Sequence, residues 1–126
     1  MNPSSVLDLD HLRRYTHADP ALESELVALF REQCALWLRA LDPKGDAETW
    51  RSGAHALKGS ARGIGAFALA EACEDAEALT GEAGTPVARS VALETLRVAM
   101  NEALAAAATL EHRAATSFRK GGSAAR

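Results

Sequence analysis

Apolar residues recur at every third or fourth position along almost the whole chain, and this period limits the possible folds more than any other feature. On an α-helix such spacing places the apolar side chains on one face, which is buried against neighbouring elements. No segment shows the alternation of apolar and polar residues that a half-buried strand requires. Abundant alanine and an aromatic content of only 5% also favour closely packed helices. The sequence therefore predicts an all-α fold.

Four long helices are predicted, each with its own apolar face. The faces are Leu22, Leu26, Leu29, Gln33, Leu36 and Ala40 in residues 18–42, flanked by Phe30 and Trp37; Trp50, Ala54, Leu57, Ala61 and Ile64 from residue 46 onward; Ala66, Leu69, Cys73, Ala76 and Thr80 in residues 66–80; and Leu93, Leu96, Met100, Ala103, Ala107 and Leu110 in residues 86–113.

Residues with strong helix-end preferences mark where these helices begin. Asp19 can cap the first long helix, and Pro20 suits its first position. Asp46 follows the turn-forming residues DPKGD and can cap the next helix, while Pro86 can open the last one.

The connections between the predicted helices are short, so sequential helices are expected to be antiparallel neighbours. This predicts an antiparallel four-helix bundle with a short additional N-terminal helix, although an irregular all-α domain could use the same helices. Residues 1–18 form an N-terminal segment with the short helix, and residues 19–112 form the bundle. Residues 113–126 are expected to be a basic, disordered tail because the apolar period ends there.

Charge and cysteine content exclude several classes of protein. A formal net charge of −3 argues against a nucleic-acid-binding surface. The chain shows neither a signal peptide nor an apolar run of membrane-spanning length. Cys34 and Cys73 do not make a disulfide framework, and with His11, His17 and His112 they lack the spacing of a metal site. We therefore expect a cytoplasmic protein that binds no metal, nucleic acid or membrane.

A basic stripe lies one residue along from the apolar face that begins at Trp50. Its members repeat the helical spacing: Arg51, His55, Lys58 and Arg62. One residue is a rotation of about 100°, so the stripe is expected beside the buried face and exposed. A neutral imidazole has a lone pair for nucleophilic attack, and nearby cations could offset the charge of a phosphoryl group. Basic residues at this spacing are nevertheless more often an ordinary solvated face.

Gly59 is unexpected inside a helix otherwise rich in alanine. Glycine in a helix interior costs up to about 1 kcal/mol relative to alanine. Its position one turn from His55 suggests that a partner must approach closely there. Gly63 and Gly65 are instead expected to end the helix and to allow the tight reversal into the next one.

The segment AHALKGSARGIGA, residues 54–66, resembles the signature of histidine-containing phosphotransfer (HPt) domains of two-component phosphorelays. The residues that match the family pattern in register are His55, Leu57, Lys58, Gly59, Ser60, Ala61, Ile64, Gly65 and Ala66. On the next helix Leu69, Cys73 and Glu77 extend the similarity. The resemblance covers roughly residues 19–112.

The resemblance implies a role for each residue around the motif. His55 would be phosphorylated through Nε2, Lys58 would help to hold the phosphoryl group, and Arg62 would add positive potential. Glu77 is expected to orient the imidazole, with two close rivals on the same helix: Glu74 and Asp75.

Partner docking is expected around the same motif. Gly59 would clear the approach to the histidine, and Arg51 lies on the same stripe. Phe30 is a further candidate for an apolar docking patch, because its helix is expected to border this face.

The resemblance implies a relay intermediate. Such a protein takes a phosphoryl group from a receiver-domain phospho-aspartate, or from a hybrid histidine kinase, and passes it to a response regulator. The sequence has no nucleotide-binding loop or kinase motif, so no kinase activity and no cofactor of its own are expected. Mg²⁺ would reside in the partner receiver domain. The chain is expected to be a monomer, and Met1 with a single-domain length favours a free-standing protein.

Two other functions fit the same helices. One is a non-catalytic helical binding module that sequesters or inhibits a signalling partner. The other is the ATP-phosphorylated domain of a chemotaxis kinase. Replacing His55 separates the first of these from phosphotransfer, because transfer that is unchanged in the variant would rule out phosphotransfer through His55, whereas a binding module would keep its partner.

Overall fold

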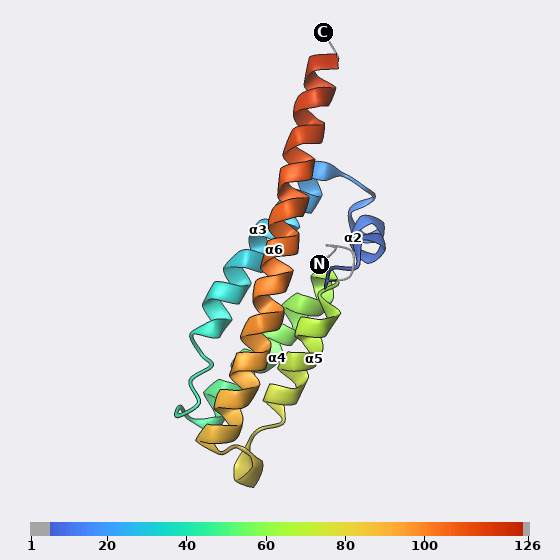
Figure 1. The fold of residues 1–126 in the computed structure, drawn as a ribbon. Coiled ribbons are helices and arrows are strands. Elements are labelled where there is room, and N and C mark those ends of the chain that lie inside the picture. The colour runs from blue at the N-terminus through green and yellow to red at the C-terminus, as the bar shows by residue number, and fades with distance from the viewer. Residues whose placement is uncertain (1–5, 125–126) are drawn as a thin grey trace.

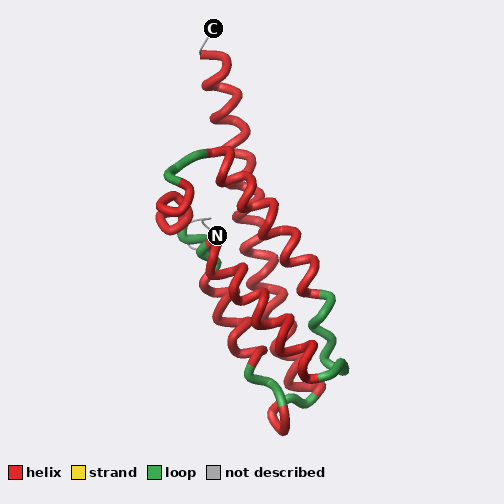
Figure 2. Tube along the Cα trace, turned by 180° about the vertical axis from the view of Figure 1, so that it is seen from behind, coloured by secondary structure: helices red, strands yellow, loops and turns green. Residues whose placement is uncertain are grey.

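The computed structural model describes residues 6–124, with side chains as far as His112. Helices make up almost all of this part of the chain, and Figure 2 shows no strand in it. In order, the elements are α2 (Leu9–Thr16), α3 (Pro20–Leu38), α4 (Ala47–Ile64), α5 (Phe67–Glu77), the short 3₁₀ helix η1 (Gly81–Ala83) and α6 (Pro86–Ala124). The prediction of an all-α fold is confirmed.

The long helices α3 to α6 form a bundle in which each one packs against two others. α4 packs on α3 and α5, and α6 closes the bundle by packing on the same two helices. The four run along a common axis, with sequential helices antiparallel, and α2 lies beside one end, where it contacts α3 (Figure 1). The predicted antiparallel four-helix bundle with a short N-terminal helix is confirmed.

Two aspartates begin the first two long helices as predicted. The Asp19 carboxylate accepts a hydrogen bond from the Ala21 amide at 3.0 Å, with Pro20 in the first turn. The Asp46 carboxylate accepts one from the Thr49 amide at 2.8 Å. Each carboxylate satisfies a backbone donor that has no partner within the helix, which stabilises the helix start.

The end of α4 differs from the prediction at one of its two glycines. Gly63 lies inside the helix, which continues through the buried Ile64. Gly65 alone adopts the left-handed conformation, with φ of 84°, that ends the helix. A single left-handed residue is enough for the reversal into α5, so Gly63 serves another purpose.

The core contains the apolar faces that were predicted for α4 and α6. The buried members are Trp50, Ala54, Leu57, Ala61, Ile64, Leu93, Leu96, Met100, Ala103, Ala107 and Leu110. From α5 and the residue before it come Ala66, Leu69, Cys73 and Ala76. Both cysteines are buried free thiols. Burial raises the pKa of Cys34 to about 11 and, as the main cause, that of Cys73 to about 12.

The predicted core face of α3 is wrong by about one residue. The buried apolar side chains are Val27, Phe30 and Cys34, whereas Leu29 and Leu36 are 50% and 49% exposed. α3 carries apolar residues on more than one face, so the period alone fits two rotations of the helix. The predicted face ran through Gln33, whose amide the core would leave unpaired. In the structure the Gln33 side chain instead accepts a hydrogen bond from the partly buried Trp37 indole at 2.8 Å.

The end of α6 also differs from the prediction. Instead of losing order near residue 113, the chain stays helical to Ala124, and α6 extends beyond the end of the bundle (Figure 1). Residues 113–120 contain no proline or glycine, so nothing in them stops a helix that the bundle has already started. Residues 125–126 of the predicted tail lie outside the described part. None of the described helices is both long and apolar enough to span a membrane.

Candidate functional site

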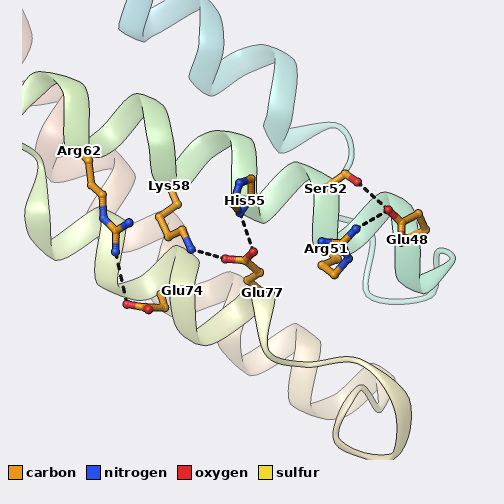
Figure 3. A network of polar contacts seen from close by, with 8 residues as sticks. All are labelled: Glu48, Arg51, Ser52, His55, Lys58, Arg62, Glu74 and Glu77. Carbon is orange, nitrogen blue, oxygen red and sulfur yellow. Dashed lines mark hydrogen bonds and ion pairs between the residues drawn. The ribbon is translucent and has the colours of Figure 1, made fainter.

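The basic stripe predicted for residues 51–62 lies along one edge of α4, beside α5 (Figure 3). His55 stands in the middle of this edge, with 64% of its side chain exposed. Arg51 and Arg62 are also exposed, whereas only 13% of the Lys58 side chain is accessible. The stripe is therefore less uniform than the spacing suggests, because one cation is largely covered.

Glu77, at the end of α5, contacts the imidazole. Its Oε2 lies 2.7 Å from Nδ1 of His55, whereas Glu74 is directed toward Arg62 (Figure 3). Asp75, the other rival, has no hydrogen bond or ion pair with His55 among the described side chains. An ionised carboxylate can only accept hydrogen bonds, so the ring nitrogen must donate. With its proton on Nδ1, a neutral imidazole keeps the lone pair on Nε2. This geometry leaves Nε2 as the nucleophilic atom of an exposed ring.

Lys58 binds the other oxygen of the same carboxylate. Its Nζ donates to Glu77 Oε1 at 2.6 Å. The hydrogen bond from Lys58, followed by the one from His55, lowers the pKa of Glu77 below its ordinary value. Glu77 is therefore ionised at neutral pH and able to accept from both residues.

The two arginines of the stripe are paired with carboxylates as well. Arg51 donates to Glu48 at 2.6 Å, and Arg62 lies 3.7 Å from Glu74. Both pairs are exposed, so water and salt weaken them. The cations of the stripe therefore do not form the free positive rim that the sequence suggested.

A core tryptophan fixes the register between α4 and α5. The indole of Trp50 donates to the carbonyl of Ala76 at 2.7 Å, one residue before Glu77. Arg89 lies over the Trp50 ring, 5.3 Å from its centre, and donates to the carbonyl of Leu79 at 3.0 Å. These buried contacts hold the end of α5 in place and so keep Glu77 opposite His55. Sequence reasoning assigned Trp50 only a packing role, since its distant partner gives no local signal.

The other side of α4 borders an open groove. The groove has a volume of about 380 Å³ and is lined by Gly59 and Gly63 of α4, Leu26 and Leu29 of α3, and Tyr15 of α2, among others. A Cβ atom added at either glycine would meet nothing within 4 Å. The two glycines therefore give the groove a smooth, open wall that begins one turn from His55.

Two predicted residues take different places around this groove. Phe30 was predicted as an exposed docking residue, but it is only 3% exposed. It belongs to the core and forms part of the buried base of the groove. Gly63, predicted as a helix terminator, forms part of the groove wall. The sequence signal for the role of Gly63 was its spacing of four residues from Gly59. Residues at this spacing share one face of a helix, so both glycines leave the same face without side chains.

Among the described side chains, no three histidines, cysteines, aspartates or glutamates are grouped so that they could hold a metal ion. The chemistry available at the His55 edge is that of an exposed imidazole beside a carboxylate and an ammonium group. Such a site can attack an electrophilic phosphorus atom through Nε2.

Comparison with known proteins agrees with this arrangement. The family model of the Hpt domain matches residues 21–115. Among solved structures, the chain is similar to the crystal structure of the histidine phosphotransferase ShpA from Caulobacter crescentus. The two are 37% identical, the match covers 90% of this chain and 97% of that one, and the TM-score is 0.71. A search of curated proteins gave no match.

An all-helical bundle with an exposed histidine on one edge is the architecture of a phosphotransfer protein. The chain belongs to the Hpt domain family and is a phosphorelay intermediate. Its membership implies partners from two-component phosphorelays, such as receiver domains.

Proposed function

We propose that His55 is the residue that carries the phosphoryl group, and that Nε2 is the atom that bonds to phosphorus. The observation that supports this is the 2.7 Å contact between Nδ1 of His55 and Glu77, on a ring that is largely exposed. One nitrogen is occupied by the carboxylate, so only the other is free to attack.

The transfer needs no movement of the Nδ1 proton. Nε2 attacks the phosphorus of a receiver phospho-aspartate, an N–P bond forms, and the P–O bond to the aspartate breaks. The electron pair of that bond leaves with the aspartate carboxylate. The ring then carries a proton on Nδ1 and phosphorus on Nε2, so it is positively charged, and the ionised Glu77 stabilises that charge. In the reverse direction the charged ring is a good leaving group.

The partner would dock on the α3 side of the histidine. Gly59 and Gly63 leave the surface of α4 open, and Leu29 is about half exposed and so available for contact with a partner. Apolar surface beside a groove is typical of protein-binding sites. A receiver domain seated there can bring its aspartate to Nε2 of His55. Arg51, paired with Glu48, lies at the far end of the edge and would act at the rim of the interface.

The chain itself is expected to need no cofactor, and Mg²⁺ would be held by the acidic pocket of the partner receiver. A monomeric state and a cytoplasmic location are part of the same proposal, and both rest on the family resemblance. The direction in which phosphoryl groups flow depends on which partner is phosphorylated first.

Replacement of the histidine tests the proposed site. The variant His55→Gln should fold normally and accept no phosphoryl group from a phosphorylated receiver, measured with radiolabelled phosphate. His112→Gln is the matched control, because His112 is an exposed histidine on α6 and should leave transfer unchanged. Transfer to the His55→Gln protein would contradict the assignment. Retained receiver binding without transfer is the expected result, because the groove is intact.

A further inference from the structure

The short helix α2 presents a surface that the function proposed above does not use. α2 lies beside the end of the bundle at which α4 reverses into α5 (Figure 1). It also precedes residue 21, where the match to the Hpt family model begins. The exposed side chains of α2 are therefore an addition to the matched core, and they can distinguish this chain from other proteins with the same bundle.

Two exposed aromatic side chains lie on and beside α2. Tyr15 is 65% exposed and lines the groove on the α3 side of α4. Phe67, at the start of α5, is 47% exposed and packs edge-on against the His11 ring, with the ring centres 5.6 Å apart. His11 precedes Tyr15 by one turn, so the two share a side of α2. His11, Tyr15 and Phe67 therefore form an aromatic patch that continues the groove over the end of the bundle.

This aromatic patch has the composition of a protein-binding surface. Among the described side chains, Tyr15 and Phe67 are the only exposed members of the tyrosine, phenylalanine and tryptophan set. Tyrosine and phenylalanine are enriched in the centres of protein interfaces, where they bury much apolar area for little loss of conformational freedom. The exposed aromatic area is thus concentrated where the groove ends.

Buried contacts hold the patch in place before any partner arrives. Leu7 and Leu12 are fully buried in the core. The Asp8 amide donates to the carbonyl of Gly65 at 3.0 Å, and a Cβ at Gly65 would lie 3.1 Å from Asp8. α2 is therefore packed closely against the reversal between α4 and α5. A surface that is already ordered loses less entropy when a partner covers it.

The turn between α2 and α3 also holds α2 against the bundle. His17 and Ala18 have φ of 53° and 58°, a left-handed conformation that is unfavourable for residues other than glycine. Such strain persists where the surrounding contacts fix the backbone, and it is common beside functional sites.

The arginines of α2 differ from those of α4 in their pairing. Arg13 and Arg14 are exposed, and neither forms an ion pair with a described side chain. Asp10 lies one turn before Arg14 but is not paired with it among the described residues. The exposed arginines of the basic stripe on α4 are instead each paired with a glutamate. A cation without such a partner can attract acidic groups of another protein.

We propose that the aromatic patch is a second contact region for the receiver domain and selects which receiver exchanges phosphoryl groups with the protein. The receiver that fits it carries an apolar side chain opposite Tyr15 and Phe67 and acidic groups opposite Arg14. This inference rests on the proposed function, because it requires a receiver seated at the groove beside His55. The groove is within reach of every receiver that approaches His55, whereas the patch binds only one that also extends over α2.

The test uses two receiver domains, one that takes phosphoryl groups rapidly from the phosphorylated protein and one that takes them slowly. Tyr15→Ser and Phe67→Ser should each lower kcat/KM for the rapid receiver about tenfold, through a higher KM with an unchanged kcat. Transfer to the slow receiver should change less than twofold, so the preference narrows about tenfold. No change with either receiver, or equal slowing with both, would overturn the proposal.

The charge on α2 is tested by its effect on association. Arg14→Glu should slow association with the rapid receiver and weaken its dependence on salt, measured by stopped flow. Arg39→Glu is the matched control, because Arg39 is an exposed arginine at the other end of α3. Equal effects of the two variants would contradict an acidic contact at α2.

Val87→Ser is the control for loss of exposed apolar area. Val87 is 75% exposed on α6 and does not line the groove, so this variant should leave transfer to both receivers unchanged. A loss equal to that of Tyr15→Ser would show that the patch has no special role.

Phosphoramidate, a small phosphoryl donor that needs no docking surface, separates docking from chemistry. It should phosphorylate Tyr15→Ser and Phe67→Ser at the wild-type rate and His55→Gln not at all. Phosphorylation of His55→Gln would refute the proposed function itself. Normal phosphorylation of Tyr15→Ser together with an unchanged receiver preference would refute only the role of the patch.

Discussion

The two sides of α4 at His55 have different surroundings. On the α5 side, charged residues are joined in pairs, and one carboxylate binds both His55 and Lys58 at 2.7 and 2.6 Å. On the α3 side, two glycines and apolar side chains line an open groove. The charged groups on the α5 side already have partners within the chain. The groove on the α3 side is covered by none of the described residues. The difference indicates that α5 prepares the ring and that α3 receives the partner.

The largest effect should come from a charge placed in the open side. Gly59→Glu would put a carboxylate one turn from His55, where a docking receiver would have to cover it beside its own acidic pocket. Burial of an unpaired charge at an interface should weaken transfer and binding by about a hundredfold or more. Stopped-flow transfer and calorimetric titration with the receiver measure both.

Ser90→Glu is the control for this change, because Ser90 is an exposed position on α6 away from the groove. Both variants should remain folded, and neither should melt below the wild type, since glutamate is a better helix former than glycine. Unaltered binding of Gly59→Glu would show that the partner does not approach over this glycine.

Two glycines of α4 sharpen the contrast between closed and open surfaces. A Cβ at Gly53 would lie 2.8 Å from the Ala40 Cβ, whereas one at Gly59 would meet nothing. Gly53→Ala should therefore lower the free energy of unfolding by about 2 kcal/mol through overpacking. Gly59→Ala should raise it by about 0.5–1 kcal/mol, because alanine is the better helix former. Urea denaturation gives both values, and equal changes at the two positions would contradict the described packing.

Two leucines of α3 test which part of the surface binds. Leu29 lines the groove and Leu36 does not, although both are about half exposed. Leu29→Asp should weaken receiver binding about tenfold, since it removes an apolar contact and adds a charge at the interface. Leu36→Asp should leave binding unchanged. Comparable losses in both variants would mean that the interface is not centred on the groove.

The smallest effect concerns the charged side of α4. The pKa of Glu77 is lowered from an ordinary value of 4.5, mainly by the hydrogen bond from Lys58. The folded state therefore prefers the ionised form, and this preference stabilises the protein above that pH. The stabilisation should disappear as the pH falls through the lowered pKa.

The difference in unfolding free energy between wild type and Glu77→Gln measures this contribution. It should be about 1 kcal/mol at pH 7 and should shrink steadily below pH 4.5. Glu74→Gln is the control, since Glu74 lies 3.7 Å from Arg62 in an exposed pair and should change stability less. A Glu77→Gln difference that does not vary with pH would contradict the assigned pairing.

Much of the fold could be predicted because its signals are local. Asp19 and Asp46 cap helices through amides two and three residues away, and the face of α4 has one clear apolar stripe. α3 was harder, because Leu29 and Phe30 are both apolar and only packing decides which of them enters the core. The helix beyond residue 113 follows from propagation of an existing helix, which the apolar period does not report.

Only part of the candidate site could be predicted from the sequence. The stripe containing His55 follows from helical spacing alone, so the sequence was enough to identify it. The pairing of Lys58 with Glu77 needs the register between α4 and α5, which the buried contact of Trp50 with the Ala76 carbonyl sets. The sequence suggested free cations because it does not show which carboxylates lie opposite them.

The central claim is that Glu77 occupies Nδ1 of His55 and leaves Nε2 to carry the phosphoryl group. The most direct test is NMR of the ¹⁵N-histidine-labelled protein after phosphorylation by a receiver, with ³¹P–¹⁵N coupling used to locate the new bond. The account predicts one phosphorylated histidine, His55, with phosphorus on Nε2 and a proton retained on Nδ1. Phosphorus on Nδ1, or on any other histidine, would contradict it.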